Sequence, residues 1–415
     1  MNNKMDKMDK MDKIINCEVC GNSTLKTVLN LGSHPMCDDL VEVGSMRHCK
    51  EYPIEILWCD NCLTAHQKYQ IPKEELFPSS YHYRSRFTAD VLNGMKNLVN
   101  SCEKKFGSLA KKKILDIGCN DGSLLNFFKE KNGITFGIEP TDAYKDAIEN
   151  GHIAYNEFLS PDVADNFILK NGKPDIITFT NVFAHIENLH DVLKSLKILL
   201  SPDTIIVIEN HYLGSVLSGN QFDTFYHEHP RTYSYTSFLS IAKSLGCDLL
   251  DVEFPSRYGG NIRIFMGDKS KDVNIKIDID ILMKKEKEFV KQFESINENI
   301  VVWKRKMKAR LSDYIQQHGK LKAKAFPGRA AILIKLLDLD ENSISAVYEK
   351  PGSMKIGHYL PGTRVPIISD DELLCSSGEP ILNLAWHISD EIKKYLKKKG
   401  CNGDVVDILD ANDFL

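Results

Sequence analysis

Four consecutive side chains that can donate, accept or move protons stand at residues 226–229, which read Tyr-His-Glu-His. Such a run is costly to bury without a purpose, because each group loses its hydrogen bonds to water. Histidine titrates near neutrality and a neighbouring glutamate raises its basicity, so Tyr226, Glu228 and His229 favour general acid–base catalysis. The alternatives are a surface loop or a metal site formed by His227, Glu228 and His229, although ligands adjacent in a loop rarely converge on one ion.

A second chemical signal is the segment 114–122, which reads ILDIGCNDG. An apolar strand pattern runs into a glycine turn and then into a helical pattern. Glycine lets the backbone turn sharply and approach a ligand, and the start of the helix offers free N–H groups. Glu139 follows at the end of the next strand pattern, in GIEP, where an acidic residue accepts both hydroxyls of a ribose.

The details of this turn favour S-adenosylmethionine (SAM) over NAD. The turn reads GxNxG and Asp116 precedes it, and an acid at that point suits the ammonium group of SAM. The alternatives are a GxGxxG loop that seats the pyrophosphate of NAD and a purely structural strand–turn–helix. The predicted SAM site consists of Asp116, Gly118, Asn120, Gly122 and Glu139.

Four of the 11 cysteines form two regularly spaced pairs, Cys17-x-x-Cys20 and Cys59-x-x-Cys62. Two such knuckles supply the four soft ligands of a tetrahedral zinc ion, and a closed four-cysteine site is structural. Chance pairs and a redox CxxC are the alternatives, and His34, Cys37 and Cys49 are substitute ligands. We expect the remaining cysteines to be thiols, most of them small buried hydrophobic residues, and not disulfides.

The elements that must position these groups form an α/β protein with several domains. Helical patterns alternate with strand patterns at 113–117, 135–138, 153–155, 175–180, 204–209 and 262–266, which predicts a parallel sheet with helices on both faces. His185 follows one of these strands, at the end where such sheets bind ligands.

The predicted domains are a zinc-binding domain at 14–84, a SAM-dependent methyltransferase domain at 85–275, a helical connector at 276–320 and a Rossmann-like domain at 321–415. The connector carries an apolar stripe at spacings of three and four, formed by Phe289, Phe293, Ile296, Ile300, Trp303, Met307, Leu311 and Tyr314. The last domain shows the alternation of strands and helices again, with apolar runs at 330–337, 345–348, 381–384 and 405–409.

Taken together, these motifs resemble the sugar C-methyltransferase family, enzymes that methylate ring carbons of nucleotide-linked 4-keto-6-deoxy sugars. The matching segments are the cysteine quartet, Tyr81-His-Tyr-Arg-Ser, IGCNDG, GIEP, His185, YHEH, Gly259-Gly-Asn-Ile-Arg263, Lys355-x-Gly-x-Tyr-x-Pro-Gly-Thr363 and Leu384-Ala-Trp386. The chain departs from the family at Tyr258, where a histidine is usual, and at 325–331, where AFPGRAA replaces a glycine-rich turn.

The resemblance implies a zinc-binding N-terminal domain, a SAM-binding Rossmann-like domain and a C-terminal Rossmann-like domain that helps to cover the sugar nucleotide. It also implies that His229 is the general base, with Tyr226, Glu228, His185 and Tyr81 around the keto sugar. The expected reaction is methylation of a ring carbon next to the ketone, C3 in preference to C5, through an enolate. The expected nucleotide is dTDP or GDP, although the sequence does not decide between these and another.

Three other functions are alternatives to carbon methylation of a sugar. An O- or N-methyltransferase needs a base but no ketone, and an NAD-dependent dehydrogenase would use both Rossmann units. A nucleic-acid-binding zinc protein is disfavoured, because the net charge is −4 and no long basic block occurs. No apolar run is long enough to span a membrane and the N-terminus lacks a secretory pattern, so we expect a cytoplasmic monomer.

Overall fold

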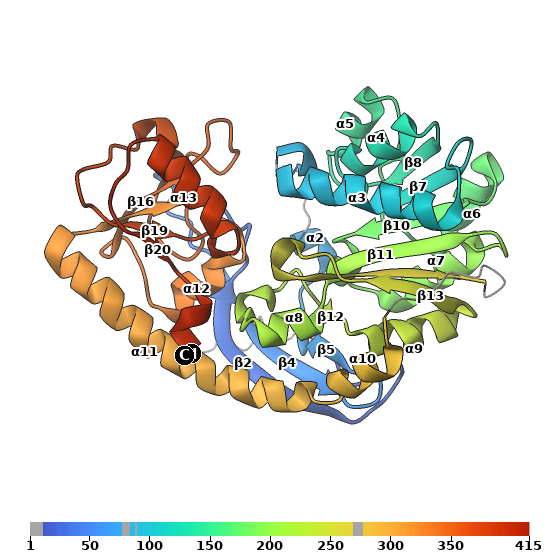
Figure 1. Ribbon diagram of the computed structural model, residues 1–415, viewed down its shortest axis with the longest axis horizontal. Helices are drawn as coiled ribbons and strands as arrows, with labels where there is room; N and C mark the ends of the chain where they lie inside the picture. The colour runs from blue at the N-terminus through green and yellow to red at the C-terminus, as the bar shows by residue number, and fades with distance from the viewer. Residues whose placement is uncertain (1–10, 77–83, 88, 269–276, 415) are drawn as a thin grey trace. The chain divides into compact units, whose positions relative to one another are not determined.

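The computed structural model describes residues 11–76, 84–87, 89–268 and 277–414 (Figure 1). The chain divides into two compact units. The first contains Met1–Thr27, Leu57–Val216 and Glu228–Val290; the second contains Val28–Ile56, Leu217–His227 and Lys291–Leu415. Four of the five boundaries between the units cut through a strand or a helix. The domain boundaries predicted from the sequence stay a prediction.

The first unit is built on a seven-stranded sheet with the order β13-β14-β11-β10-β7-β8-β9 (Figure 1). Its strands are β7 (Lys113–Ile117), β8 (Ile134–Ile138), β9 (Ile153–Tyr155), β10 (Ile176–Thr180), β11 (Ile205–His211), β13 (Asp248–Glu253) and β14 (Asn261–Gly267). The pairs from β9 to β11 are parallel, and β14 runs antiparallel to both of its neighbours. The predicted parallel sheet is confirmed for the five strands from β7 to β11. Strand β14, predicted to belong to the same parallel sheet, is antiparallel, and β13 is the strand that the sequence patterns missed.

The strand order reverses direction at one point. From β7 the chain moves outward to β8 and β9, then returns to place β10 on the other side of β7. In an open α/β sheet the loops at the carboxyl ends of the two strands flanking such a point diverge and leave a crevice for a ligand. The glycine turn follows β7 and His185 follows β10, so the topology brings both predicted motifs to this place.

Helices cover the sheet because its central strands are apolar on both faces. The helices are α3 (Ala89–Phe106), α4 (Ser123–Glu130), α5 (Tyr144–Glu149), α6 (Pro161–Asn171), α7 (Leu189–Leu199), α8 (Leu213–Ser218), α9 (Tyr235–Leu245) and α10 (Ile279–Glu286). One buried cluster joins α3 and α4 to the sheet through residues such as Leu98, Phe128 and Ile114. Because side chains alternate along a strand, the buried Leu115 faces the opposite side.

A further sheet is formed next to the second cysteine pair. Strands β12 (Arg231–Thr232), β5 (Thr64–Gln67), β4 (Glu51–Cys59) and β2 (Leu25–Pro35) form a four-stranded sheet in that order. Two small pairs add β1 (Asp12–Lys13) to β6 (Tyr69–Gln70) and β3 (Val41–Glu42) to β17 (His358–Tyr359). The short helix α2 (Lys73–Leu76) ends this part of the chain. Strand β12 lies two residues after His229, so this sheet bears directly on the position of that histidine.

The second unit contains a parallel sheet with the order β18-β16-β15-β19-β20. Its strands are β15 (Leu321–Lys324), β16 (Ile344–Glu349), β18 (Ile367–Ser369), β19 (Ile381–Asn383) and β20 (Val405–Asp407), and its helices include α12 (Ala330–Leu336) and α13 (Ser389–Lys398). The apolar run at 330–337 is therefore helical. The connector helix α11 (Phe289–His318) buries its predicted stripe from Phe289 to Leu311, and only Tyr314 is half-exposed.

One cysteine prediction is wrong. Cys375 and Cys401 form a disulfide that links the segment after β18 to the loop before β20. The two cysteines are separated by 26 residues and carry no motif, so only the fold brings their side chains together.

None of the helices in the described part of the chain combines the length and the apolar character that a membrane span requires.

Candidate active site

The turn after β7 has the geometry that its glycines predict. Gly118, Asn120 and Gly122 have φ angles of 69°, 50° and 78°, which side chains other than glycine and asparagine rarely adopt. A Cβ atom at Gly118 would lie 2.6 Å from Val182 Cγ2, in the segment after β10. The turn therefore packs against the segment across the switch point.

The two acidic residues of the predicted SAM site lie beside this turn. Glu139 is buried at the end of β8, and its Oε2 accepts a 2.9 Å hydrogen bond from the backbone N–H of Asn120. Thr141 donates from its backbone and its hydroxyl to the other oxygen, at 2.9 and 2.6 Å. Asp116 accepts a 2.6 Å bond from the Thr178 hydroxyl, and burial raises the pKa of its carboxyl to about 7. Both carboxyl groups are held by neighbouring donors in fixed orientations.

The segment before α3 is tied to the same turn. The backbone N–H of Ser85 donates to Asn120 Oδ1 at 3.0 Å, and that of Arg86 donates to Asp121 Oδ2 at 2.9 Å. Arg84 and Arg86 both reach Asp146, at 2.7 and 2.8 Å. The Tyr81-His-Tyr-Arg-Ser motif thus ends against the cofactor turn, although Tyr81 itself lies outside the described residues.

The loop after β10 is anchored by the Gly259–Arg263 motif. Asn181 has a φ of 53°, its N–H donates to Glu209 O at 2.7 Å, and its side-chain oxygen accepts from Asn261 at 3.2 Å. Asn261 also donates to the buried Glu209 carboxylate, which Arg263 contacts at 2.7 Å. The motif that the resemblance singled out therefore fixes the loop that leads to His185.

Two of the predicted catalytic histidines meet at the carboxyl edge of this sheet. His185 and His229 have ring centroids 4.7 Å apart with the planes at 64°. Burial lowers the pKa of His185 to about 4, against the opposing effect of a hydrogen bond with the backbone of Glu228. His185 is therefore a neutral imidazole at pH 7, able to donate from one ring nitrogen and accept at the other.

A third histidine, which the sequence reasoning missed, joins this pair. His211 is the last residue of β11, and its ring centroid lies 5.3 Å from that of His229. The available signal was its position at the carboxyl end of a predicted strand next to the strand that precedes His185. The three residues His185, His211 and His229 are called the histidine cluster below.

The other members of the YHEH segment are divided between the two units. His227 is buried in the second unit, where its Nε2 lies 3.0 Å from Tyr52 O, and burial lowers its pKa to about 4. Its ring also packs edge-on against Tyr52. We therefore assign His227 a structural role. Glu228 is buried in the first unit and Tyr226 is half-buried in the second. Their catalytic roles stay predictions.

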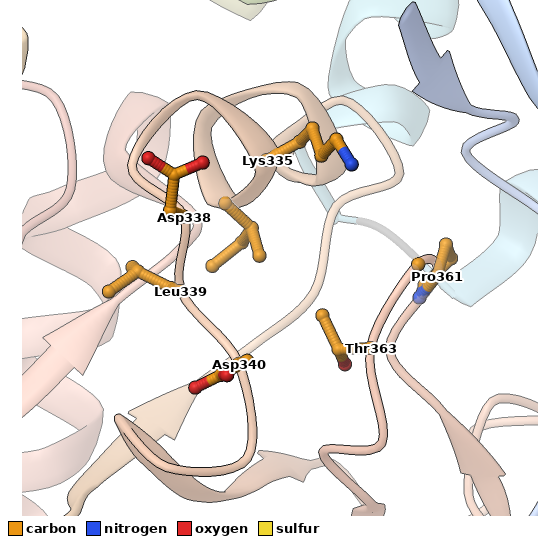
Figure 2. Close-up of a pocket in the computed structure, with 8 residues that line it drawn as sticks. Lys335, Asp338, Leu339, Asp340, Pro361 and Thr363 are labelled. Carbon is orange, nitrogen blue, oxygen red and sulfur yellow. The ribbon is translucent and has the colours of Figure 1, made fainter.

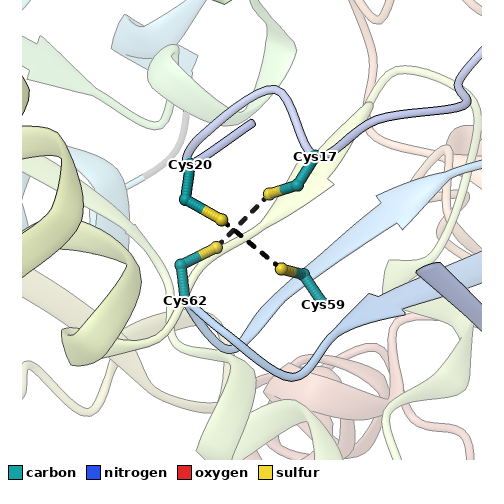
Figure 3. Close-up of side chains that lie close together, drawn as sticks. All are labelled: Cys17, Cys20, Cys59 and Cys62. Atoms are coloured by element: carbon teal, nitrogen blue, oxygen red, sulfur yellow. Dashed lines mark hydrogen bonds between the residues drawn. The ribbon is translucent and has the colours of Figure 1, made fainter. Parts of the chain in front are cut away.

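The four cysteines of the two knuckles converge. Their sulfur atoms all lie within 4.8 Å of one another, with Cys17–Cys62 at 3.4 Å and Cys20–Cys59 at 3.6 Å, and all four point to a common centre (Figure 3). A zinc ion at about 2.3 Å from each sulfur requires sulfur–sulfur distances of about 3.8 Å, which this arrangement fits. The predicted zinc site is confirmed, and in the described part of the chain residues 227–229 form no comparable group.

Three of the sulfurs also have a polar neighbour that can donate a hydrogen bond to a thiolate. The contacts are Asn22 Nδ2 to Cys59 at 3.5 Å, Asn61 Nδ2 to Cys20 at 3.2 Å and His66 Nε2 to Cys17 at 3.3 Å. Such donors stabilise the deprotonated sulfurs that bind zinc. The substitute ligands His34, Cys37 and Cys49 belong to the second unit and are not part of this group.

In the second unit, the loop that leads to Tyr226 is held by a buried ion pair. The Asp223 carboxylate accepts from Arg329 at 2.8 and 2.7 Å and from the Trp386 indole at 2.8 Å. The Arg329 guanidinium also lies over the Trp386 ring, 5.0 Å from its centroid. The AFPGRAA segment, where the chain departs from the family, thus contributes an arginine that fixes this loop together with the Leu384-Ala-Trp386 motif.

A small hollow of about 170 Å³ also lies in the second unit, between the end of α12 and the Pro-Gly-Thr turn at 361–363 (Figure 2). Two of its charged lining residues have partners: Lys335 contacts Glu51 at 2.6 Å, and Asp338 pairs with Lys308. The hollow is lined by none of the residues predicted for catalysis, and we assign it no role.

Comparison with known families agrees with this architecture. Three family models match in succession: a zinc binding domain over residues 17–77, a methyltransferase domain over 87–252 and a C-methyltransferase C-terminal domain over 256–405. This succession defines the class, a methyltransferase with a zinc-binding head and a C-terminal domain typical of carbon methylation. The chain is similar to the C-methyltransferases in all three parts, and it is a SAM-dependent C-methyltransferase.

Individual relatives show the same relationship. C-methyltransferase NovU of Streptomyces niveus is 24% identical over 394 residues, which cover 92% of this chain and 93% of NovU. Ubiquinone biosynthesis O-methyltransferase of Haemophilus ducreyi is 32% identical over only 116 residues, 26% of this chain and 49% of that protein. The C-methyltransferase part of the resemblance is confirmed, and its sugar substrate stays a prediction.

Two methyltransferases of known structure align with part of the chain. The plantazolicin methyltransferase BpumL, in complex with a pentazolic desmethylPZN analog and SAH, shares 16% identity with a TM-score of 0.36 and covers 48% of this chain and 92% of that chain. Magnesium protoporphyrin IX methyltransferase from Synechocystis PCC 6803, with bound SAM, shares 11% identity with a TM-score of 0.33 and covers 43% of this chain and 80% of that chain.

Proposed function

We propose that the enzyme methylates a ring carbon next to the ketone of a nucleotide-linked 4-keto-6-deoxy sugar, C3 in preference to C5. The observation that carries this proposal is the contact between His185 and His229, 4.7 Å apart by ring centroids, at the carboxyl edge of the sheet that bears the SAM turn. A carbon acid next to a ketone needs a base for its proton and a donor for the enolate oxygen. Two adjacent imidazoles supply both functions.

In the proposed reaction His229 takes the proton from the sugar carbon, and the electron pair of the broken C–H bond forms the enolate. A tyrosine hydroxyl or His185 donates a hydrogen bond to the enolate oxygen, a contribution typically of about 3–4 kcal/mol for each donor. SAM supplies the methyl group, whose bond to sulfur breaks as the new carbon–carbon bond forms and leaves S-adenosylhomocysteine. His229 then releases its proton to solvent. Tyr226, Glu228 and Tyr81 are proposed to surround the sugar on the basis of the resemblance.

The donor side of the proposal rests on Asp116 and Glu139. Asp116 is proposed to meet the ammonium group of SAM, and Glu139 its ribose hydroxyls. Each carboxylate oxygen of Glu139 already accepts a hydrogen bond from the protein, which orients its remaining lone pairs. The nucleotide carrier, dTDP or GDP, is part of the proposal.

The test is a matched panel of substrates. The enzyme is incubated with methyl-labelled SAM and with dTDP- and GDP-linked 4-keto-6-deoxy sugars, each beside its 4-hydroxy counterpart. We expect label only in the keto sugars, carbon-bound by NMR, and uptake of solvent deuterium at the same carbon. Methyl transfer to a hydroxyl oxygen, or equal labelling of keto and hydroxy sugars, would contradict the proposal.

A further inference from the structure

Arg231 is fully buried two residues after His229. Its Nε donates to the Tyr233 hydroxyl at 3.0 Å and its Nη1 donates to Glu18 Oε2 at 2.5 Å. Both terminal nitrogens also donate to the backbone oxygen of Glu187 at 3.3 Å. A buried guanidinium is costly unless it is paired and hydrogen-bonded, and this one meets a carboxylate, a carbonyl and a hydroxyl at once.

The carboxylate partner belongs to the zinc knuckle. Glu18 stands between Cys17 and Cys20, and its Oε2 also accepts a 2.8 Å bond from the Gln70 side chain. His66 lies against the same knuckle, with Nε2 3.3 Å from Cys17 Sγ and Nδ1 3.6 Å from Glu18. Arg231 is therefore bound to a carboxylate whose own position depends on the folded knuckle.

The backbone strengthens this link. Strand β12 pairs antiparallel with β5, which puts Arg231 opposite His66, and the N–H of Gln67 donates to Pro230 O at 2.8 Å. Pro230 directly follows His229. Strand β5, which follows the second cysteine pair, thus lies beside the segment that carries His229, the proposed base.

The contact to Glu187 extends the link to the other histidine. Glu187 follows His185 by two residues, as Arg231 follows His229. One guanidinium therefore joins three parts of the chain: the loop after β10, the loop that carries His229, and the zinc knuckle. All of these residues belong to the first unit. The planar fork of arginine can bridge three acceptors, whereas the single ammonium of lysine cannot span them.

We propose that Arg231 is a positioning residue, which sets His185 and His229 relative to each other by tying both loops to the zinc knuckle through Glu18. The inference rests on the proposed function for the catalytic role of the two histidines. It assigns the zinc domain a part in catalysis, because a shift of about 1 Å in a reacting group can lower a rate by about 100-fold.

Arg231→Met and Arg231→Lys test this role. The matched control is Lys26→Met, which breaks the exposed Lys26–Asp60 pair on the same cysteine-bearing segment. Zinc content, SAM affinity, hydrogen exchange of peptides covering 181–188 and 225–233, kcat and KM are measured for each protein. In Arg231→Met we expect zinc content and SAM affinity to stay within about twofold of wild type, exchange of both peptides to rise at least about tenfold and kcat to fall about 10–100-fold with little change in KM.

Arg231→Lys should keep a buried positive charge near Glu18 but not the bridge to Glu187, so we expect faster exchange in 181–188 than in 225–233. Lys26→Met should match wild type in every measurement. Wild-type exchange of both peptides in Arg231→Met overturns the inference, and so does loosening of only the peptide that contains Arg231 itself.

If Arg231→Met does not fold, Glu18→Gln provides the second variant, because it removes the charge and keeps the size. It should raise exchange in both peptides by a smaller factor, and wild-type exchange in Glu18→Gln would then overturn the inference. The exchange measurements need no sugar. A wild-type enzyme that methylates none of the keto sugars contradicts the proposed function, while the exchange data still decide the role of Arg231.

Discussion

The donor side of the site, residues 114–141, and the acceptor side, the histidine cluster, are built in opposite ways. On the donor side, the backbone N–H groups of Asn120 and Thr141 both donate to Glu139 within this one stretch of chain, and one longer-range bond, from Thr178, holds Asp116. On the acceptor side, the three histidines come from the ends of separate segments and meet only through the sheet order.

This difference indicates that the acceptor side sets the substrate specificity of such an enzyme. A local motif is preserved by the covalent spacing of a few residues, so it can serve many methyltransferases with one donor. The acceptor side depends on a long-range arrangement, including the zinc knuckle and strand β12, and can differ between family members without disturbing the donor turn. Substitutions on the donor side should therefore change SAM affinity, and substitutions on the acceptor side should change kcat.

The largest effect is expected for His229→Ala on the acceptor side. Removal of the base should lower methyl transfer and solvent deuterium uptake by about 10²–10⁴-fold. SAM affinity, measured by calorimetry, should not change, because the donor side is intact. His190→Asn, at an exposed histidine on α7, is the matched control. A variant His229→Ala with the wild-type rate would remove this residue from the reaction.

On the donor side, Glu139→Gln should weaken SAM binding by about 10–100-fold, because a charged hydrogen-bond acceptor is lost. The kcat at saturating SAM should stay within a few-fold of wild type. Calorimetric titration with SAM measures the first effect and initial rates the second, with the exposed Glu130→Gln as control. A fall in kcat with unchanged SAM affinity would break the proposed separation of the two sides.

The raised pKa of Asp116 predicts a pH dependence of SAM binding. With a pKa of about 7 in the free protein, this carboxyl group is largely protonated at pH 6 and must lose its proton to meet the ammonium of SAM. SAM affinity should therefore fall by up to about tenfold between pH 8 and pH 6, with proton release on binding.

Calorimetry in two buffers of different ionisation enthalpy measures the proton release. Asp116→Asn should bind SAM more weakly and with no pH dependence over this range. Asp142→Asn, at an exposed aspartate just after the GIEP segment, should behave like wild type. An unchanged pH dependence in Asp116→Asn would assign the titration to another group.

The smallest effect is expected for His211, which contacts His229 by its ring. Loss of one aromatic contact is worth about 0.5–1.5 kcal/mol, so His211→Ala should lower kcat by about 2–10-fold. His211→Phe, which keeps the ring, should restore most of this loss. Equal losses in both variants would show that a ring nitrogen of His211 takes part, and a wild-type kcat in His211→Ala would exclude the residue from the cluster's function.

Much of the fold could be predicted because each element carries its own pattern. The strands from β7 to β11 were located by apolar runs, and the stripe of α11 by its spacing. Strand β13 (Asp248–Glu253) was missed because charged residues stand at both of its ends. The Cys375–Cys401 disulfide was missed because sequence separation does not report distance in space.

The sequence by itself identified the four cysteines that converge and predicted the residues of the SAM turn, since two CxxC pairs and a glycine turn with flanking acids encode their chemistry within short stretches of chain. Only the tertiary structure decided that His211 joins His185 and His229, and that Arg231 connects Glu18 to Glu187. The physical reason is that these contacts depend on strand order and on the pairing of β12 with β5. Strand order follows from how the whole chain buries its apolar surface, and no short segment contains that information.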